Sequence, residues 1–359
     1  MPLPFVLAGA AAATVGFGFK KACDGYGKKS EATKMVKNAT QQFDFQKRDF
    51  ENKNKETTKL LDSLGKLQLK IGNDFHEFRN IADDLLAKIE KSENKEIKVN
   101  LPEYKLNKIA DLSISATTYL GQLGGGAAAG AAAAYAVYGG VMAFAAASTG
   151  TPIAALSGVA AYNATLAAIG GGSLAAGGFG MAGGAMVLGF TVAAPIFAIA
   201  GWGFDKYAEK AQREASEYQR EVIDAMDKMK ISIRALNETI AYVKYLSSEL
   251  ERIYQEFYKY FEQIKAISVL IKNGVLSFDS LNEYVLITID NGYQMAAILT
   301  DIITIPLFKV KKDISGAAII KDDTPEMELD QNGLQVLNNE EINYYLRKGK
   351  TEEIEKVIR

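Results

Sequence analysis

An unusually long stretch without charge limits what this chain can fold into. The 93 residues from Leu112 to Phe204 contain no Lys, Arg, Asp, Glu or His, although 23% of the whole chain is charged. The stretch has 28 Ala and 20 Gly, which together make up about half of it. Helices with no charged face need a protein or lipid partner on every side. We call residues 112–204 the uncharged window.

Small residues recur at every fourth position of the uncharged window. The longer row consists of Ala160, Ala164, Ala168, Gly172, Ala176, Gly180 and Gly184. The shorter row consists of Gly121, Gly125, Ala129 and Ala133. Rows of this kind leave a smooth groove in which another helix can approach closely, as in membrane helix pairs. They predict a helix-packing face, through which copies of the chain would assemble as a homo-oligomer in a bilayer.

The breaks and borders of the window suggest its layout. The sequence STGTP at 148–152 predicts a turn, and therefore a helical hairpin. Trp202 and Phe204 stand at one border and Tyr119 near the other. Aromatic side chains gather at membrane–water interfaces, so these three are the predicted interface residues.

The window is only marginally suited to a bilayer. Residues 121–150 contain few Leu, Ile, Val or Phe, which each favour insertion by about 0.3–0.6 kcal/mol. Glycine also weakens a helix by about 1 kcal/mol relative to alanine. This balance favours a segment that is first hidden in protein and later inserted. The alternative is a permanently dry core, enclosed by the protein's own amphipathic helices.

Two charged regions flank the window, and each predicts a very long amphipathic helix. Apolar residues recur every three or four positions in 28–93 and again in 204–273. Rods of this length must pack along a partner, and we expect them to pack on each other. Pro102 starts a further helix, Asn273-Gly274 ends the second rod, and a helix over 279–304 stops before Pro306. The first stripe is Leu60, Leu64, Leu67, Ile71, Phe75, Phe78, Ala82, Leu85 and Ile89.

The two ends of the chain differ in character. Residues 2–19 are uncharged and run into Lys20 and Lys21, which predicts a membrane anchor or a buried apolar end. A signal peptide carries its basic residues before the apolar run and is the alternative that stays open.

The sequence divides into five regions. These are 1–27, an apolar segment; 28–111, a long-helix region; 112–204, the hairpin; 205–306, the completion of the bundle; and 307–359, a polar tail with a short helix.

The residues that enzymes use are scarce. The chain has one histidine, His76, and one cysteine, Cys23, and its net charge is −2. Its glycine-rich stretches lack the lysine of a phosphate-binding loop. We therefore expect no catalytic residues, no cofactor, no metal site and no nucleic-acid partner. His76 lies beside the apolar stripe and is expected to be solvated or to pack between helices.

The order of these parts resembles the ClyA-type α-helical pore-forming toxins over residues 28–272. That resemblance implies a soluble elongated bundle that releases a hydrophobic element, inserts it and oligomerises. Residues 148–189 and the first 26 residues are also similar to segments of uncharacterised bacterial proteins. The additional apolar start and the longer window differ from the toxin pattern and favour an effector that stays inside the cell over a secreted toxin.

Together these features predict an all-α protein, an elongated bundle of long amphipathic helices with a Gly/Ala-rich hairpin. Its expected activity is to permeabilise or remodel a lipid bilayer as an oligomer. We expect membrane association, with a soluble cytoplasmic form before insertion as an open alternative. The competing interpretation is a non-enzymatic scaffold that binds a partner protein through its long helices and buries the window as a core.

Overall fold

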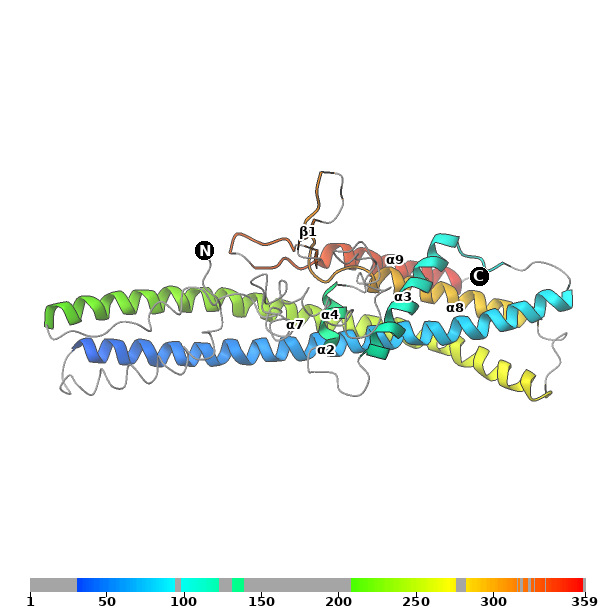
Figure 1. Ribbon diagram of the computed structural model, residues 1–359, viewed down its shortest axis with the longest axis horizontal. Helices are drawn as coiled ribbons and strands as arrows, with labels where there is room; N and C mark the ends of the chain where they lie inside the picture. The colour runs from blue at the N-terminus through cyan, green and yellow to red at the C-terminus, as the bar shows by residue number, and fades with distance from the viewer. Residues whose placement is uncertain are drawn as a thin grey trace.

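The protein is mostly helical, as a computed structural model of the chain shows (Figure 1). The structure describes residues 31–93, 98–122, 131–138, 208–275, 282–314, 316, 319–321, 324–325, 327–332 and 334–357. In its coarse form, the all-α prediction is confirmed. The described part of the uncharged window consists of residues 112–122 and 131–138, and the predicted turn at 148–152 lies outside it.

Two long helices lie side by side along the longest axis of the molecule (Figure 1). Helix α2 spans Glu31–Glu93 and helix α7 spans Ala208–Lys272. The side chain of Gln46 donates a hydrogen bond to the carbonyl of Met226, and Tyr254 donates one to Asp74; both pairs are 180 residues apart. A constant offset means that the two helices run parallel, so both begin at the same end.

The apolar stripes of both helices form their contact. Phe75, Phe78, Leu85 and Ile89 of α2 are fully buried, and Leu60 is partly buried against the same core. The buried stripe of α7 includes Leu236, Val243, Leu250, Tyr254, Phe257, Phe261 and Ile264. Burying a Leu, Ile or Phe side chain contributes about 1.5–3 kcal/mol each, so this pair depends on many such contacts.

An aromatic cluster forms the tightest part of the core. The ring of Phe78 lies 5.2 Å from Phe257, 6.3 Å from Phe261 and 5.1 Å from Tyr293, all in edge-on geometry. Tyr293 belongs to helix α8, Asn282–Ile303. Gly292, on the same helix, leaves room for Phe78, because an added Cβ would lie 2.5 Å from its ring. The cluster therefore joins three helices.

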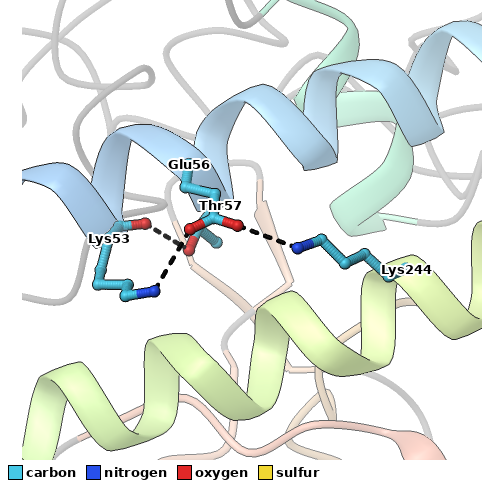
Figure 2. A network of polar contacts seen from close by, with 4 residues as sticks. All are labelled: Lys53, Glu56, Thr57 and Lys244. Carbon is cyan, nitrogen blue, oxygen red and sulfur yellow. Dashed lines mark hydrogen bonds and ion pairs between the residues drawn. The ribbon is translucent and has the colours of Figure 1, made fainter.

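A polar network at the edge of the stripe includes one ion pair that joins α2 to α7 (Figure 2). Lys244 Nζ lies 3.0 Å from Glu56 Oε1, and Lys53 Nζ lies 3.4 Å from the other carboxylate oxygen. Thr57 Oγ1 donates to the Lys53 carbonyl at 2.8 Å. The hydrogen bond from Lys244 holds the pKa of Glu56 below its ordinary value.

The helix ends follow the expected signals. Helix α7 ends where Gly274 adopts a φ of 69°, and its N–H donates to the Ile271 carbonyl while that of Val275 donates to Leu270. This pair of bonds is a Schellman cap, which glycine allows because it has no Cβ. Helix α3, Glu103–Gln122, begins directly after Pro102.

The C-terminal segment packs on the bundle and is not wholly solvated. It contains β1 (Ile320–Lys321) and β2 (Thr324–Pro325), which pair antiparallel, and α9 (Asn339–Val357), which is longer than the short helix expected there. Its apolar side chains Leu307, Phe308, Met327, Ile342 and Leu346 are buried in the core.

An ion pair attaches α9 to α7. Lys350 Nζ lies 3.1 Å from Glu249 Oε2. Burial raises the pKa of Glu249, but hydrogen bonds from Lys350 and Arg252 outweigh that effect and lower it. The carboxylate therefore stays ionised and keeps the pair at neutral pH.

Candidate functional site

The described start of the uncharged window is buried in protein. Helix α3 carries its first residues and helix α4, Ala131–Tyr138, carries the next described ones. Both helices pack on α2. The buried side chains of the window at this interface are Leu112, Ala116, Tyr119, Ala132, Ala133, Tyr135, Ala136 and Val137. We call this α2–α3–α4 interface the shelter.

Two glycines of α2 make the shelter possible. A Cβ atom on Gly65 would lie 1.7 Å from the carbonyl oxygen of Ala132, and one on Gly72 would lie 2.5 Å from the Cβ of Ala116. No side chain fits at such distances without moving the neighbouring helix. The main chain of α4 therefore rests almost directly on the main chain of α2. At Gly65, contact between the two main chains therefore takes the place of contact between large apolar side chains.

Polar contacts hold α4 at both of its ends. At the start of α4, the backbone N–H of Ala132 donates to Asp62 Oδ1 of α2 at 3.2 Å. Asp62 is also paired with Lys66 at 2.8 Å. At the other end, the N–H of Leu307 donates to the carbonyl of Val137 at 2.9 Å. These bonds satisfy one terminal donor and one terminal acceptor of a helix only eight residues long.

Several polar atoms in the shelter are left unpaired. Within the described residues, four buried side-chain atoms have no hydrogen-bond partner: Gln68 Oε1, Ser113 Oγ and the Tyr135 hydroxyl, together with Asn54 Oδ1 of α2. Gln68 lies on the same face of α2 as Gly65 and Gly72. Burial raises the pKa of Tyr135. The side chain of nearby Ser115 offsets only part of that rise, and the two hydroxyl groups are not in hydrogen-bond geometry. An unpaired buried polar group costs about 1–3 kcal/mol, so the shelter is weaker than its burial indicates.

Two of the predicted site residues lie in α3, and the structure gives them different positions. Tyr119 is buried with 6% exposure and packs on Tyr135, with ring centres 5.6 Å apart. A position at a membrane interface would require α3 and α4 to leave α2. Gly121 is exposed, and an added Cβ there would meet nothing within 4 Å. The predicted helix-packing role of Gly121 is therefore not seen in this arrangement, because its face of α3 points away from α2.

The remaining predicted residues lie outside the described part of the chain. They are Gly125, Ala160, Ala164, Ala168, Gly172, Ala176, Gly180, Gly184, Trp202 and Phe204. The packing face and the second interface position stay predictions. Ala133, the last member of the shorter row, is fully buried in the shelter.

The sequence reasoning missed Gly65, Gly72 and Asp62. The signal was available, because two glycines seven residues apart on an apolar stripe lie on one helix face. Each glycine weakens a helix interior by about 1 kcal/mol, which a close helix contact can offset.

The described residues offer little to metal or catalytic chemistry. They contain no group of three or more His, Cys, Asp or Glu side chains that could hold a metal ion. His76 is exposed on α2. Tyr254 donates a 2.5 Å hydrogen bond to Asp74, and burial followed by this bond raises the pKa of Tyr254. Such a pair stabilises the α2–α7 contact.

No helix in the described part of the chain combines the length and the apolar character that crossing a membrane requires. Comparisons with protein-family models, with curated proteins and with solved structures found no match to this chain. Its function must therefore be argued from its own residues.

Proposed function

We propose that this protein holds its uncharged window against α2 and releases it into a lipid bilayer, where copies assemble and permeabilise or remodel the membrane. The elongated pair of α2 and α7 serves as the rigid support. Helices α3 and α4 are the first part of the window to be released. The protein acts without cofactor or metal and is not an enzyme in this proposal.

The observation that supports release is that the shelter contains buried polar atoms without hydrogen-bond partners. Unpaired buried atoms of Gln68, Ser113 and Tyr135 each reduce the free energy that holds α3 and α4 in place. The glycine contacts contribute little apolar surface, because neither Gly65 nor Gly72 has a side chain to bury. A contact of this kind can be exchanged for lipid at a lower cost than a fully paired core.

Release is confined to the shelter because the α2–α7 contact is formed by large apolar side chains and is harder to open. That contact has an aromatic cluster and a row of large aliphatic side chains. A bilayer that removes α3 and α4 would leave this rod intact. The α2–α7 pair would then keep its shape while the window exchanges its contact with α2 for contact with lipid.

A vesicle assay tests the proposal. Purified full-length protein is mixed with dye-loaded liposomes of neutral and anionic composition, between pH 4 and pH 8, and both flotation with the vesicles and dye release are measured. The proposal expects both. A protein that neither floats with vesicles nor releases dye under any of these conditions contradicts it.

A scaffold is the second candidate, and one observation favours it. The described part of the window is already buried in protein, as a permanent Ala/Gly core would be. In that case the long helices bind a partner protein and bilayers have no effect. The two candidates separate in the same experiment, because a scaffold predicts no dye release and no change of the shelter on adding vesicles.

A further inference from the structure

The residues that follow α8 contact the end of α4. We call residues 304–308 the strap; its apolar side chains Ile305, Leu307 and Phe308 are buried. The N–H of Leu307 donates a hydrogen bond to the carbonyl of Val137 at 2.9 Å. Val137 lies in the last turn of α4, where a carbonyl has no partner within its own helix. The strap therefore supplies a donor that the end of α4 needs.

The strap is held in turn by the residue that precedes α9. The backbone N–H of Asn338 donates to the carbonyl of Leu307 at 2.8 Å, and its side-chain amide donates to the carbonyl of Pro306 at 3.3 Å. The N–H of Leu307 is thus bonded to α4, and its carbonyl is bonded to the start of α9. Two successive backbone hydrogen bonds connect Val137 to Asn338 through a single residue of the strap.

Asn338 also caps α9. Its carbonyl accepts a hydrogen bond from the N–H of Ile342 at 3.2 Å, and its side-chain amide donates to Glu341 Oε2 at 2.9 Å. Asparagine is among the residues preferred at this N-cap position. The residue is buried, so its polar groups depend on these protein partners. One side chain therefore positions both the first turn of α9 and the strap.

The far part of α9 is fixed to the long helices. Helix α9 lies beside α8 (Figure 1). A Cβ atom on Gly349 would lie 2.6 Å from Cγ2 of Ile298, so the two helices approach this closely because the residue is glycine. Lys350, the next residue, forms the ion pair with Glu249 of α7. The strap is thus connected through α9 to helices that do not belong to the window.

Helix α4 depends on such outside contacts. It has only eight residues, and isolated helices of this length are not stable in water. Three of its buried side chains, those of Ala132, Ala133 and Ala136, are alanines, which remove little apolar surface from water. The hydrogen bonds at its two ends therefore make up a large share of what holds it on α2.

We propose that the strap and residues 338–350, together called the clamp, are an autoinhibitory device that keeps α4 on α2 until α9 moves away from α8. This inference rests on the proposed function and adds its regulation. Gly349 is eleven residues from Asn338, or about 16 Å along the helix. A signal that acts on this part of α9 would weaken the shelter without touching it.

Gly349→Gln tests the clamp at a distance from the window. The new side chain overlaps Ile298 and moves α9 away from α8, while every residue of the shelter stays the same. Hydrogen exchange of the α4 amides should become on the order of fivefold faster, as expected for the loss of one net hydrogen bond. Dye release from liposomes should increase with it. Arg347→Gln is the matched control, because it places the same side chain on the exposed face of α9 and should change neither quantity.

A second variant separates the strap from the capping of α9 and decides the question if Gly349→Gln does not fold. Asn338→Ser keeps a residue that caps helices about as well as asparagine does. Its hydroxyl is one bond nearer the main chain and does not reach the carbonyl of Pro306. Exchange in α9 should stay as in the native protein, and exchange in α4 should become roughly twofold faster.

The outcomes separate the clamp from the proposed function. Faster exchange in α9 with unchanged exchange in α4 overturns the clamp, whether or not the native protein releases dye. Equal effects of Gly349→Gln and Arg347→Gln contradict it too, as does an equal rise of exchange in α4 and in the α2–α7 core. Faster exchange confined to α4 and α9, with no dye release from any form of the protein, supports the clamp and contradicts the permeabilising function.

Discussion

Helix α2 makes two contacts of very different construction. Toward α7 it presents large side chains, such as Phe75 and Phe78, which are fully buried and pack edge-on against Phe257. Toward α3 and α4 it presents Gly65 and Gly72, and the interface includes polar atoms without partners. The same helix therefore forms one contact from its own large side chains and another in which its glycines let α3 and α4 approach closely.

The difference shows which part of the molecule can change partner. A large apolar side chain loses its stabilising contacts once it is exposed to water, so the α2–α7 contact is costly to open. The shelter loses less, because its unpaired polar groups gain hydrogen bonds with water or headgroups when it opens. The comparison predicts a hierarchy of stability, which the following variants test in order of expected effect.

Removing the central aromatic ring should have the largest effect. Phe78→Ala leaves a cavity between α2, α7 and α8 and should reduce the free energy of unfolding by about 3–5 kcal/mol. Denaturant unfolding followed by circular dichroism measures it. A loss below about 1 kcal/mol would mean that the aromatic cluster is not the main stabilising contact of the rod.

Adding a side chain at the close glycine contact should weaken the shelter and leave the α2–α7 contact unaffected. Gly65→Ala forces α4 away from α2, because the added Cβ overlaps the Ala132 carbonyl. It should destabilise the shelter by about 1–3 kcal/mol, although alanine is the better helix former. Hydrogen exchange of α4 should speed up while that of the α2–α7 core is unchanged, and dye release should increase.

The matched control for this change is Gly121→Ala. Gly121 is exposed in α3 with open space around it, so alanine there should leave the shelter intact or stabilise it by up to about 1 kcal/mol. If both variants speed exchange in α4 equally, the close contact at Gly65 has no special role.

Removing an unpaired hydroxyl should strengthen the shelter. Tyr135→Phe keeps the ring packed on Tyr119 and eliminates a buried group without a described partner, so the protein should gain about 1 kcal/mol. Slower exchange in α4 and slower dye release should accompany that gain. A loss of stability in this variant would show that the hydroxyl has a partner and that the shelter is better paired than we infer.

The smallest effect concerns pH at the edge of the α2–α7 contact. The pKa of Glu56 is lowered in the folded protein, so its stabilising contribution is present above the ordinary carboxyl pKa and is lost as pH falls through the lower, folded value. Glu56→Gln should therefore show a slightly flatter fall in melting temperature below about pH 4.5 than the native protein. An unchanged pH profile would mean that the Lys244 contact is not populated in solution.

Most of the described helices could be predicted from the sequence. The apolar stripe from Leu64 to Ile89 predicted a buried helix face, and the Asn273-Gly274 pair predicted where α7 stops. The parallel direction could not be predicted, because an amphipathic stripe looks the same from either end. The connection between α2 and α7 is long enough to allow both directions, so only the register of pairs such as Gln46 and Met226 reveals it.

The candidate site was harder to predict. Small residues of the window were expected to contact one another, whereas the described contacts join Ala116 and Ala132 to glycines of a charged helix. A small residue allows a close approach but does not determine which neighbour approaches. Gly121 illustrates this, since its spacing suits a packing face and its position in α3 leaves it exposed.

The most direct test of the account is a reversible lock across the shelter. Gly72→Cys/Ala116→Cys in a Cys23→Ser background places two Cβ atoms 2.5 Å apart, about 1 Å closer than a disulfide prefers, so α3 must shift only slightly for the bond to form. Dye release from anionic liposomes is measured with the bond formed and again after reduction, with each single cysteine variant as a control. The account predicts that the oxidised protein binds vesicles without releasing dye and that reduction restores release. Equal dye release before and after reduction would contradict it.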